Sequence, residues 1–234
     1  MLEIGGRPIL WHIMKLYAVH GITDFVICCG YKGTLIKEYF LNYHNRNSDF
    51  TIDLSTNTID VSHSTVEPWR VTLVDTGLDS MTGGRIKRIA PHIGDETFCL
   101  TYGDGVSNID IGKLVAFHHE QGTAATVTAV RQPGRFGTLD LSEDLARVNQ
   151  IREKSMLDGQ TINGGFFVLE PSVFDLIDGD DTVWEEAPLQ RLVSSGQLSV
   201  FRHHGFWQNM DTLRDKNLLQ SMWDSKDPPW RVWN

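Results

Sequence analysis

The first part of the chain alternates between two hydrophobic periods, and this alternation constrains the fold more than any other feature. Apolar residues recur at helical spacing from Pro8 until Gly21, and residues 24–30 then form a continuous apolar run that ends in glycine. Such a run is typical of a strand buried on both faces. Because the alternation continues to about residue 130, it predicts a mostly parallel sheet flanked by helices on both faces.

The same periods predict the individual elements. We expect helices over 8–21, 32–43, 83–92 and 111–120, strands over 24–30, 71–74, 98–102 and 124–130, and a hairpin made of 51–54 and 58–61. The later part is more mixed, with strands over 137–141, 148–152, 164–169 and 198–202 and helices over 172–177, 185–195 and 212–223. No repeat or low-complexity linker separates the parts, so we expect one α/β domain over 1–234 with a mixed C-terminal portion. Residues 228–233 are too apolar for a solvated tail and should pack on this chain or on a partner subunit.

Charge and hydropathy exclude some classes of protein. The formal net charge of −9 argues against the broad basic surface that binds nucleic acid, although it does not argue against a mononucleotide. The sequence has no apolar run near the ~20 residues that cross a bilayer, and no basic and apolar leader at its start. We therefore expect a cytoplasmic protein that does not bind membranes.

Two acidic residues are candidates for a metal site. Asp104 lies between Gly103 and Gly105 just after the strand predicted at 98–102, and ligands of open parallel sheets bind beyond the carboxyl ends of strands. Its carboxylate suits a hard cation that also takes phosphate oxygens, but an ordinary Asp-Gly turn is the alternative. Asp211 precedes the helix predicted at 212–223, where it is either a second ligand or the N-cap of that helix.

The loop at 76–85 is the candidate nucleotide site. It is rich in small residues and lies between a predicted strand and a predicted helix, so its exposed amides could face the base or phosphates of a nucleotide. An ordinary surface loop with a basic helix face remains the alternative. The candidate residues here are Ser80, Gly83, Gly84 and Arg85.

A third group of residues suits a sugar. Glu153 and Lys154 end a predicted strand, and Asn163 and Gly164 open the next one. Polar side chains beside bare backbone can bind sugar hydroxyls, and the lysine can meet a phosphate. The alternative is a surface pair and a tight turn.

These signals together, in this order, resemble the sugar nucleotidyltransferase family over essentially all 234 residues. Within that family, the sequences of segments 67–77, 80–85 and 206–212 are most similar to the cytidylyltransferase branch that makes CDP-glucose. The resemblance implies a Rossmann-like nucleotidyltransferase fold, usually oligomeric, that uses Mg²⁺, CTP and α-D-glucose 1-phosphate and releases pyrophosphate. It also implies that CDP-glucose supplies deoxysugars for surface polysaccharide.

The resemblance also implies roles for residues. Asp104 and Asp211 would be the metal ligands, Ser80, Arg85 and Gly103 would contact the nucleotide, and Lys154 would contact the sugar phosphate. Residues 1–130 would then form mostly the nucleotide-binding half and residues 131–234 the sugar-binding half with the C-terminal helices.

Two departures from the family pattern stand out. Family members open with a strand and a glycine-rich phosphate loop that are not seen before Glu3, so we expect residues 1–234 alone to be impaired in transfer, with an unpaired interior strand edge. In addition, Arg152 and Ser155 flank the Glu-Lys pair where relatives often have glutamine and proline. The alternatives are transfer of another nucleotide or sugar, a non-catalytic binding subunit, and a metal-dependent glycosyltransferase.

Overall fold

The computed structural model describes residues 1–131, 138–141, 148–152 and 161–233. The chain begins with a tight antiparallel pair, β1 (Glu3–Ile4) and β2 (Arg7–Pro8), which leads into α1 (Ile9–Ala18). Pro8 immediately precedes the helix, where its missing N–H costs no hydrogen bond. The helix buries its apolar side chains as the sequence pattern predicts.

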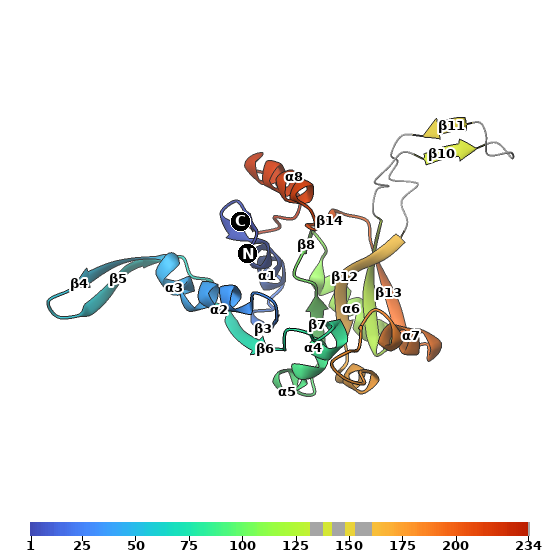
Figure 1. The fold of residues 1–234 in the computed structure, drawn as a ribbon, viewed down its shortest axis with the longest axis horizontal. Helices are drawn as coiled ribbons and strands as arrows, with labels where there is room; N and C mark the ends of the chain where they lie inside the picture. Colours follow the sequence, from blue (N-terminus) through green and yellow to red (C-terminus); the bar gives the residue numbers. More distant parts are fainter. Residues whose placement is uncertain (132–137, 142–147, 153–160, 234) are drawn as a thin grey trace.

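The first parallel pair is β3 (Asp24–Cys29) with β6 (Arg70–Asp75). Between them the chain forms α2 (Gly33–Leu41), α3 (Tyr43–Arg46) and the hairpin of β4 (Ser48–Asp53) and β5 (Thr58–Ser64). This hairpin was predicted from the sequence, and Figure 1 shows that it extends away from the rest of the molecule.

A four-stranded sheet has the order β13 (Leu198–His203), β9 (Ala125–Arg131), β12 (Thr161–Leu169) and β7 (Phe98–Thr101). The α/β class is confirmed, and the sheet is mixed: β13 is parallel to β9, whereas β12 is antiparallel to both of its neighbours. Strand direction is set by chain connections, which a hydrophobic period does not encode. The halves expected on either side of residue 130 share this sheet, because β9 pairs with two later strands.

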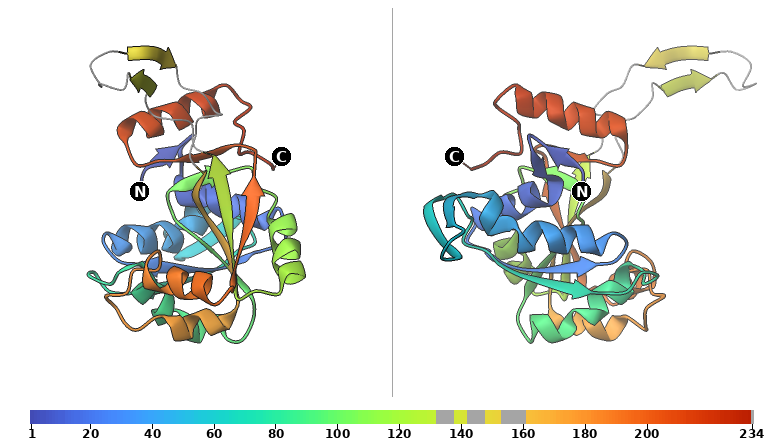
Figure 2. Two further views of the ribbon diagram at one scale, coloured as in Figure 1. Left: turned by 90° about the vertical axis from the view of Figure 1, so that its right-hand side faces the viewer. Right: turned by 60° about the vertical axis from the view of Figure 1, so that its left-hand side comes forward.

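Helices cover the sheet. α6 (Ile111–Gln121) contacts β9, β12 and β13, and α7 (Ala187–Ser194) contacts β13 (Figure 2). The helix expected over 83–92 is two short ones, α4 (Thr82–Arg88) and α5 (Ala90–Ile93). Pro91 lies in the first turn of α5, because proline cannot continue the hydrogen-bond ladder of a preceding helix. The segment expected to be helical at 172–177 is a 3₁₀ helix, η2 (Pro171–Leu176). A separate antiparallel pair is formed by β10 (Thr138–Leu141) and β11 (Val148–Arg152).

The C-terminal segment packs on its own chain. The Trp230 side chain is 1% exposed and belongs to a core cluster with residues of α1, α8 (Leu213–Asp224) and the central sheet. α8 lies against the turn between β1 and β2, where a Cβ on Gly5 would come within 2.0 Å of Trp223 Nε1. The packing of residues 228–233 expected from their apolar character is therefore confirmed.

β3 and β7 face each other without pairing. In the part of the chain that the structure describes, β3 pairs with β6 and β7 with β12, and no strand lies between β3 and β7. A cavity of about 570 Å³ lies there, lined by apolar side chains such as Ile13, Ile27, Leu100 and Val168. Each of the two strands therefore has one edge that no described strand pairs with.

Candidate active site

The candidate metal ligands converge although they lie far apart in the sequence. Asp104 follows β7 and precedes β8 (Gly105–Ser107), and β8 pairs with β14 (Trp207–Asn209) so that Gly105 opposes Asn209. The amide of Met210 donates to the carbonyl of Asp104 at 2.8 Å. This short antiparallel ladder therefore brings Asp211 beside Asp104.

The charge of Asp211 acts on Asp104. Asp104 retains solvent-exposed surface, but its pKa is raised, first because the surrounding protein displaces water from the carboxylate and second because of the negative charge of Asp211. Two carboxylates that repel each other favour a bound cation, because a divalent ion relieves both the desolvation and the repulsion.

Asp211 is not the N-cap of α8, which was the alternative that the sequence left open. The cap is Thr212, whose hydroxyl accepts from the Asp215 amide at 3.2 Å, while the Asp215 carboxylate accepts from the Thr212 amide at 2.9 Å. This reciprocal capping box satisfies the first turn of the helix without Asp211. The Asp211 carboxylate instead accepts a hydrogen bond from the Asn209 side chain.

The two carboxylates fit a magnesium ion. Mg²⁺ is commonly held by one or two carboxylates, with water and substrate phosphate completing its coordination. Within residues 1–131, 138–141, 148–152 and 161–233, no cluster of three or more His, Cys, Asp or Glu side chains could hold a metal alone. A two-carboxylate site matches this donor set, and the assignment of Asp104 and Asp211 as ligands stays a prediction.

Gly103 borders open space beside Asp104. A Cβ built on Gly103 would meet nothing within 4 Å, apart from its chain neighbours. The residue is also solvent-exposed. The backbone at this strand end is thus accessible to a ligand, and the nucleotide contact of Gly103 stays a prediction.

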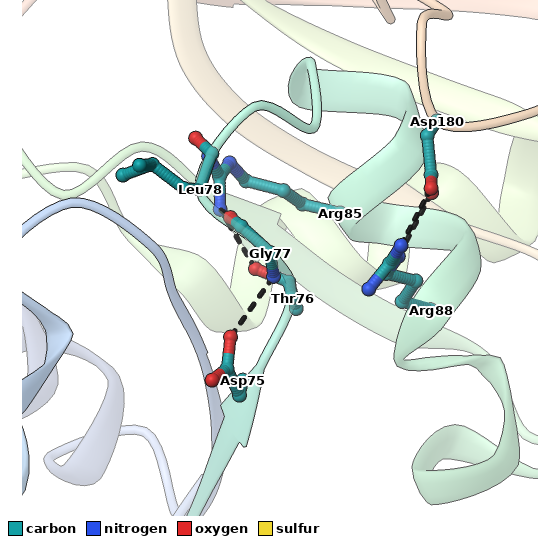
Figure 3. A network of polar contacts seen from close by, with 7 residues as sticks. All are labelled: Asp75, Thr76, Gly77, Leu78, Arg85, Arg88 and Asp180. Carbon is teal, nitrogen blue, oxygen red and sulfur yellow. Dashed lines mark hydrogen bonds and ion pairs between the residues drawn. The ribbon is translucent and has the colours of Figure 1, made fainter.

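Arg85 holds the loop that was expected to bind a nucleotide. Its guanidinium donates to the Thr76 hydroxyl at 2.9 Å and to the carbonyls of Gly77 and Leu78 at 2.8 and 3.0 Å (Figure 3). It also lies over Gly30, where a Cβ would come within 2.2 Å of one of its nitrogens. Three of the five guanidinium N–H groups are used in these bonds with described residues.

Gly83 and Gly84, which were expected to contact the nucleotide, use their amides within the protein. Their amides are not exposed, because both donate to the carbonyl of Thr182, at 2.9 and 3.2 Å. A Cβ on Gly83 would lie 2.7 Å from that carbonyl oxygen, and one on Gly84 would lie 2.3 Å from the carbonyl oxygen of Asp180. These glycines allow α4 to pack closely on the segment around residue 180, and contact of either with a nucleotide stays a prediction.

Ser80 lies at the inner side of the same loop. Its side chain is largely buried, and a Cβ on Gly77 would approach its hydroxyl oxygen to 2.9 Å. Gly77 has a φ of +84°, so the loop turns at a residue that tolerates the left-handed region. The turn holds Ser80 close to the end of β6, and its predicted nucleotide contact is untested.

On the sugar side, the structure describes Asn163 and Gly164 but not Glu153 or Lys154, which lie outside the described residues. Asn163 and Gly164 are in β12, where the register with β9 shifts between Asn163 and Phe167. The Asn163 side chain accepts from the Gly165 amide at 2.8 Å. The Gly164 carbonyl accepts from the Trp207 indole at 2.7 Å. This bond ties the β12 bulge to β14, the strand that precedes Asp211.

Sequence reasoning missed two polar residues beside these segments. Tyr102 donates its hydroxyl proton to Glu185, which also accepts from the Thr82 hydroxyl at 2.7 Å. Tyr102 was visible as part of the strand before Asp104, whereas Glu185 gave no signal because its partners lie 83 and 103 residues away in the sequence.

Known proteins resemble this chain in sequence and in fold. Residues 1–209 match the protein family described as nucleotidyl transferase. Two proteins named glucose-1-phosphate cytidylyltransferase, from Salmonella typhi and Salmonella typhimurium, are each 56% identical to this chain over 234 residues, which is 100% of this chain and 90% of each relative. The crystal structure of HddC from Yersinia pseudotuberculosis has the same fold, with a TM-score of 0.68 and 19% identity, covering 95% of this chain and 88% of that one.

Proposed function

The chain belongs to the nucleotidyl transferase family, and we propose that it transfers the cytidylyl group of CTP to α-D-glucose 1-phosphate, forming CDP-glucose and pyrophosphate. The observation that carries the proposal is 56% identity along the whole chain with two glucose-1-phosphate cytidylyltransferases. That level lies far above the 19% at which the HddC structure still shares the fold. The chain is therefore an enzyme of the transferase class.

The reaction asks the protein for position and charge compensation. A phosphate oxygen of the sugar phosphate forms a bond to the α-phosphorus of CTP, and the bond from that phosphorus to the bridging oxygen of the β-phosphate breaks in line. The electron pair leaves with pyrophosphate, so no protein nucleophile is needed. Residues that align the two substrates and offset phosphate charge supply most of the catalysis.

We infer that Asp104 and Asp211 hold a magnesium ion for this reaction. The ion, when bound, neutralises charge on the phosphates and fixes their geometry. The raised pKa of Asp104, caused by displaced water and by the charge of Asp211, supports the assignment because a cation would relieve both effects. Of the proposed nucleotide contacts, Gly103 directly precedes Asp104, and Ser80 lies in the loop between β6 and α4.

The sugar phosphate is assigned to the other half of the site. We propose that Lys154 meets its phosphate and that Glu153, Asn163 and Gly164 meet its hydroxyls, following the resemblance to the cytidylyltransferase branch. Support from the fold comes from the link between the Gly164 carbonyl and Trp207, which joins the β12 bulge to the strand before Asp211. The remaining nucleotide contacts proposed are Gly83, Gly84 and Arg85.

We further propose a homo-oligomer joined through the β4–β5 hairpin. One face of this hairpin carries two apolar cross-strand pairs, Phe50 with Val61 and Ile52 with Ile59, and each of these side chains is 41–64% exposed. An exposed apolar sheet face of this kind is typical of a contact with another chain.

No described helix is long and apolar enough to cross a membrane. We place the activity in the cytoplasm and its product in the synthesis of surface polysaccharide.

The test is pyrophosphate release by the purified protein with each of CTP, UTP, dTTP and GTP, with glucose 1-phosphate and Mg²⁺. We expect consumption of CTP, loss of turnover on chelation by EDTA, and near-complete loss in Asp104→Asn. The matched control is Asp95→Asn. It removes an exposed carboxylate that precedes the start of β7, whereas Asp104 follows the end of that strand. Magnesium-dependent CTP binding without product would instead identify a non-catalytic binding subunit, and consumption of another triphosphate would identify a different nucleotidyltransferase.

A further inference from the structure

The segment 180–185 braces the start of α4, which ends the proposed nucleotide loop. The carbonyl of Asp180 accepts from the Met81 amide at 2.8 Å, and the Trp184 amide donates to the Thr82 hydroxyl at 2.9 Å. Both oxygens of the Asp180 carboxylate also accept from Arg88, one from Nε and the other from Nη2 (Figure 3). The helix start is thus held by backbone and side-chain bonds from one short stretch of chain.

Glu185 ends this segment and joins it to a second part of the site. One carboxylate oxygen accepts from the Thr82 hydroxyl at 2.7 Å, and the other accepts from the Tyr102 hydroxyl. Hydroxyl donors to an ionised carboxylate make short, charge-assisted bonds with defined geometry. Among the described residues, no Lys, Arg or His forms an ion pair with Glu185, so these hydroxyls set its orientation.

Tyr102 carries the connection to the acidic segment and to the sugar side. It lies two residues before Asp104, and its amide donates to the Gly165 carbonyl at 3.2 Å. Its hydroxyl is 3.4 Å from the Asn163 amide nitrogen, which donates to it. Gly165 has a φ of +76° and is packed so closely that a Cβ there would lie 2.6 Å from the Tyr102 ring. The ring therefore has little freedom to move.

We propose that Glu185 is a positioning residue for nucleotidyl transfer, which fixes the nucleotide loop through Thr82 and the Asp104 segment through Tyr102. The proposal rests on the proposed function of the same site. Glu185 acts through these hydroxyls, since each of its carboxylate oxygens accepts from one of them. It sets the distance between two segments that the backbone joins through α4, α5 and β7.

Steady-state kinetics of two Glu185 variants and one Tyr102 variant test the effect of this positioning on the reaction. We expect Glu185→Ala to lower kcat/KM about tenfold, the size expected for loss of a hydrogen bond to a charged group, and to raise the Mg²⁺ concentration at half-maximal rate. Glu185→Gln keeps an acceptor for Tyr102 and a hydrogen-bonding group for Thr82, so it should stay within about threefold of the wild type. Tyr102→Phe should cost several-fold in the wild-type background and clearly less in Glu185→Ala, because both changes break the Tyr102–Glu185 bond and only the long contact from Asn163 is left to lose.

A second measurement is independent of turnover. Hydrogen exchange of peptides covering 76–88 and 100–106 should be faster in Glu185→Ala than in the wild type, while exchange elsewhere is unchanged. The control is Glu186→Ala, an exposed neighbour that forms no ion pair among the described residues and whose side chain donates to or accepts from no described group. It should match the wild type in kinetics and in exchange.

The outcomes separate the two proposals. If the wild-type protein releases no pyrophosphate from CTP and glucose 1-phosphate, the proposed function fails, and the exchange data still decide whether Glu185 braces the two segments. If Glu185→Ala matches Glu186→Ala in kcat/KM and Mg²⁺ dependence, the positioning role is overturned even where exchange changes. Additive losses for Tyr102→Phe and Glu185→Ala would overturn it too.

Discussion

His12 should make the folded protein sensitive to acid. Its side chain is 1% exposed, one ring nitrogen lies 2.9 Å from the Ile4 carbonyl, and the other accepts from the Trp230 indole at 3.4 Å. These partners suit a neutral ring that donates once and accepts once. Burial lowers the pKa of His12 from 6.5 to about 4, with the backbone bonds opposing this and the charge of Arg7 adding to it.

The free energy at stake follows from that shift. Because the folded-state pKa lies below the unfolded value, the unfolded chain binds the proton first, so this contribution to stability is complete above about pH 6.5 and is lost as the pH falls toward 4. At 1.36 kcal/mol for each unit of pKa, lowering the pH from 7 to 4.5 should remove about 2 kcal/mol of unfolding free energy through this group alone.

The assay is urea unfolding of the wild type and of His12→Gln at pH 7 and pH 4.5. Glutamine donates to the Ile4 carbonyl and accepts from the Trp230 indole without titrating, so the variant retains the partners and loses the pH dependence. Carboxylates titrate equally in both proteins and cancel in the difference. An equal loss of stability in the two proteins, or a His12 resonance titrating near pH 6.5 in the folded state, would refute the reasoning.

The remaining predictions concern the site and the hairpin. Asp211→Asn should lower kcat by roughly 100-fold or more, since a catalytic metal supplies several kcal/mol, while its unfolding midpoint without Mg²⁺ stays at or above that of the wild type because a repulsion is removed. Gly84→Ala should destabilise the fold by about 1–3 kcal/mol through overlap with the Asp180 carbonyl, as measured by urea unfolding. Gly103→Ala has open space, so it should leave stability unchanged and weaken CTP binding; equal stability of the two alanine variants would contradict one of the two stability statements. Ile59→Lys should shift the protein toward the monomer in analytical ultracentrifugation, and an unchanged mass would exclude the hairpin interface.

Local patterns in the sequence determined most of the elements. The helical period after Pro8, the apolar run that forms β3, and the alternation on both sides of Asn57 predicted α1, β3 and the β4–β5 hairpin. Each depends on neighbouring residues only, since a strand or an amphipathic helix repeats within a few positions. The candidate acids were recognised in the same way, from their place after a strand and before a helix.

The tertiary structure decided what those residues do. It gave the cap of α8 to Thr212 and left Asp211 beside Asp104, and it turned the amides of Gly83 and Gly84 toward Thr182. It also set β12 antiparallel between β9 and β7. All of these depend on pairs of segments that are distant along the chain, and a hydrogen-bond partner or a neighbouring charge at such separation leaves no trace in a local period. The sequence specifies which residue types are available, and the packing of remote segments specifies their partners.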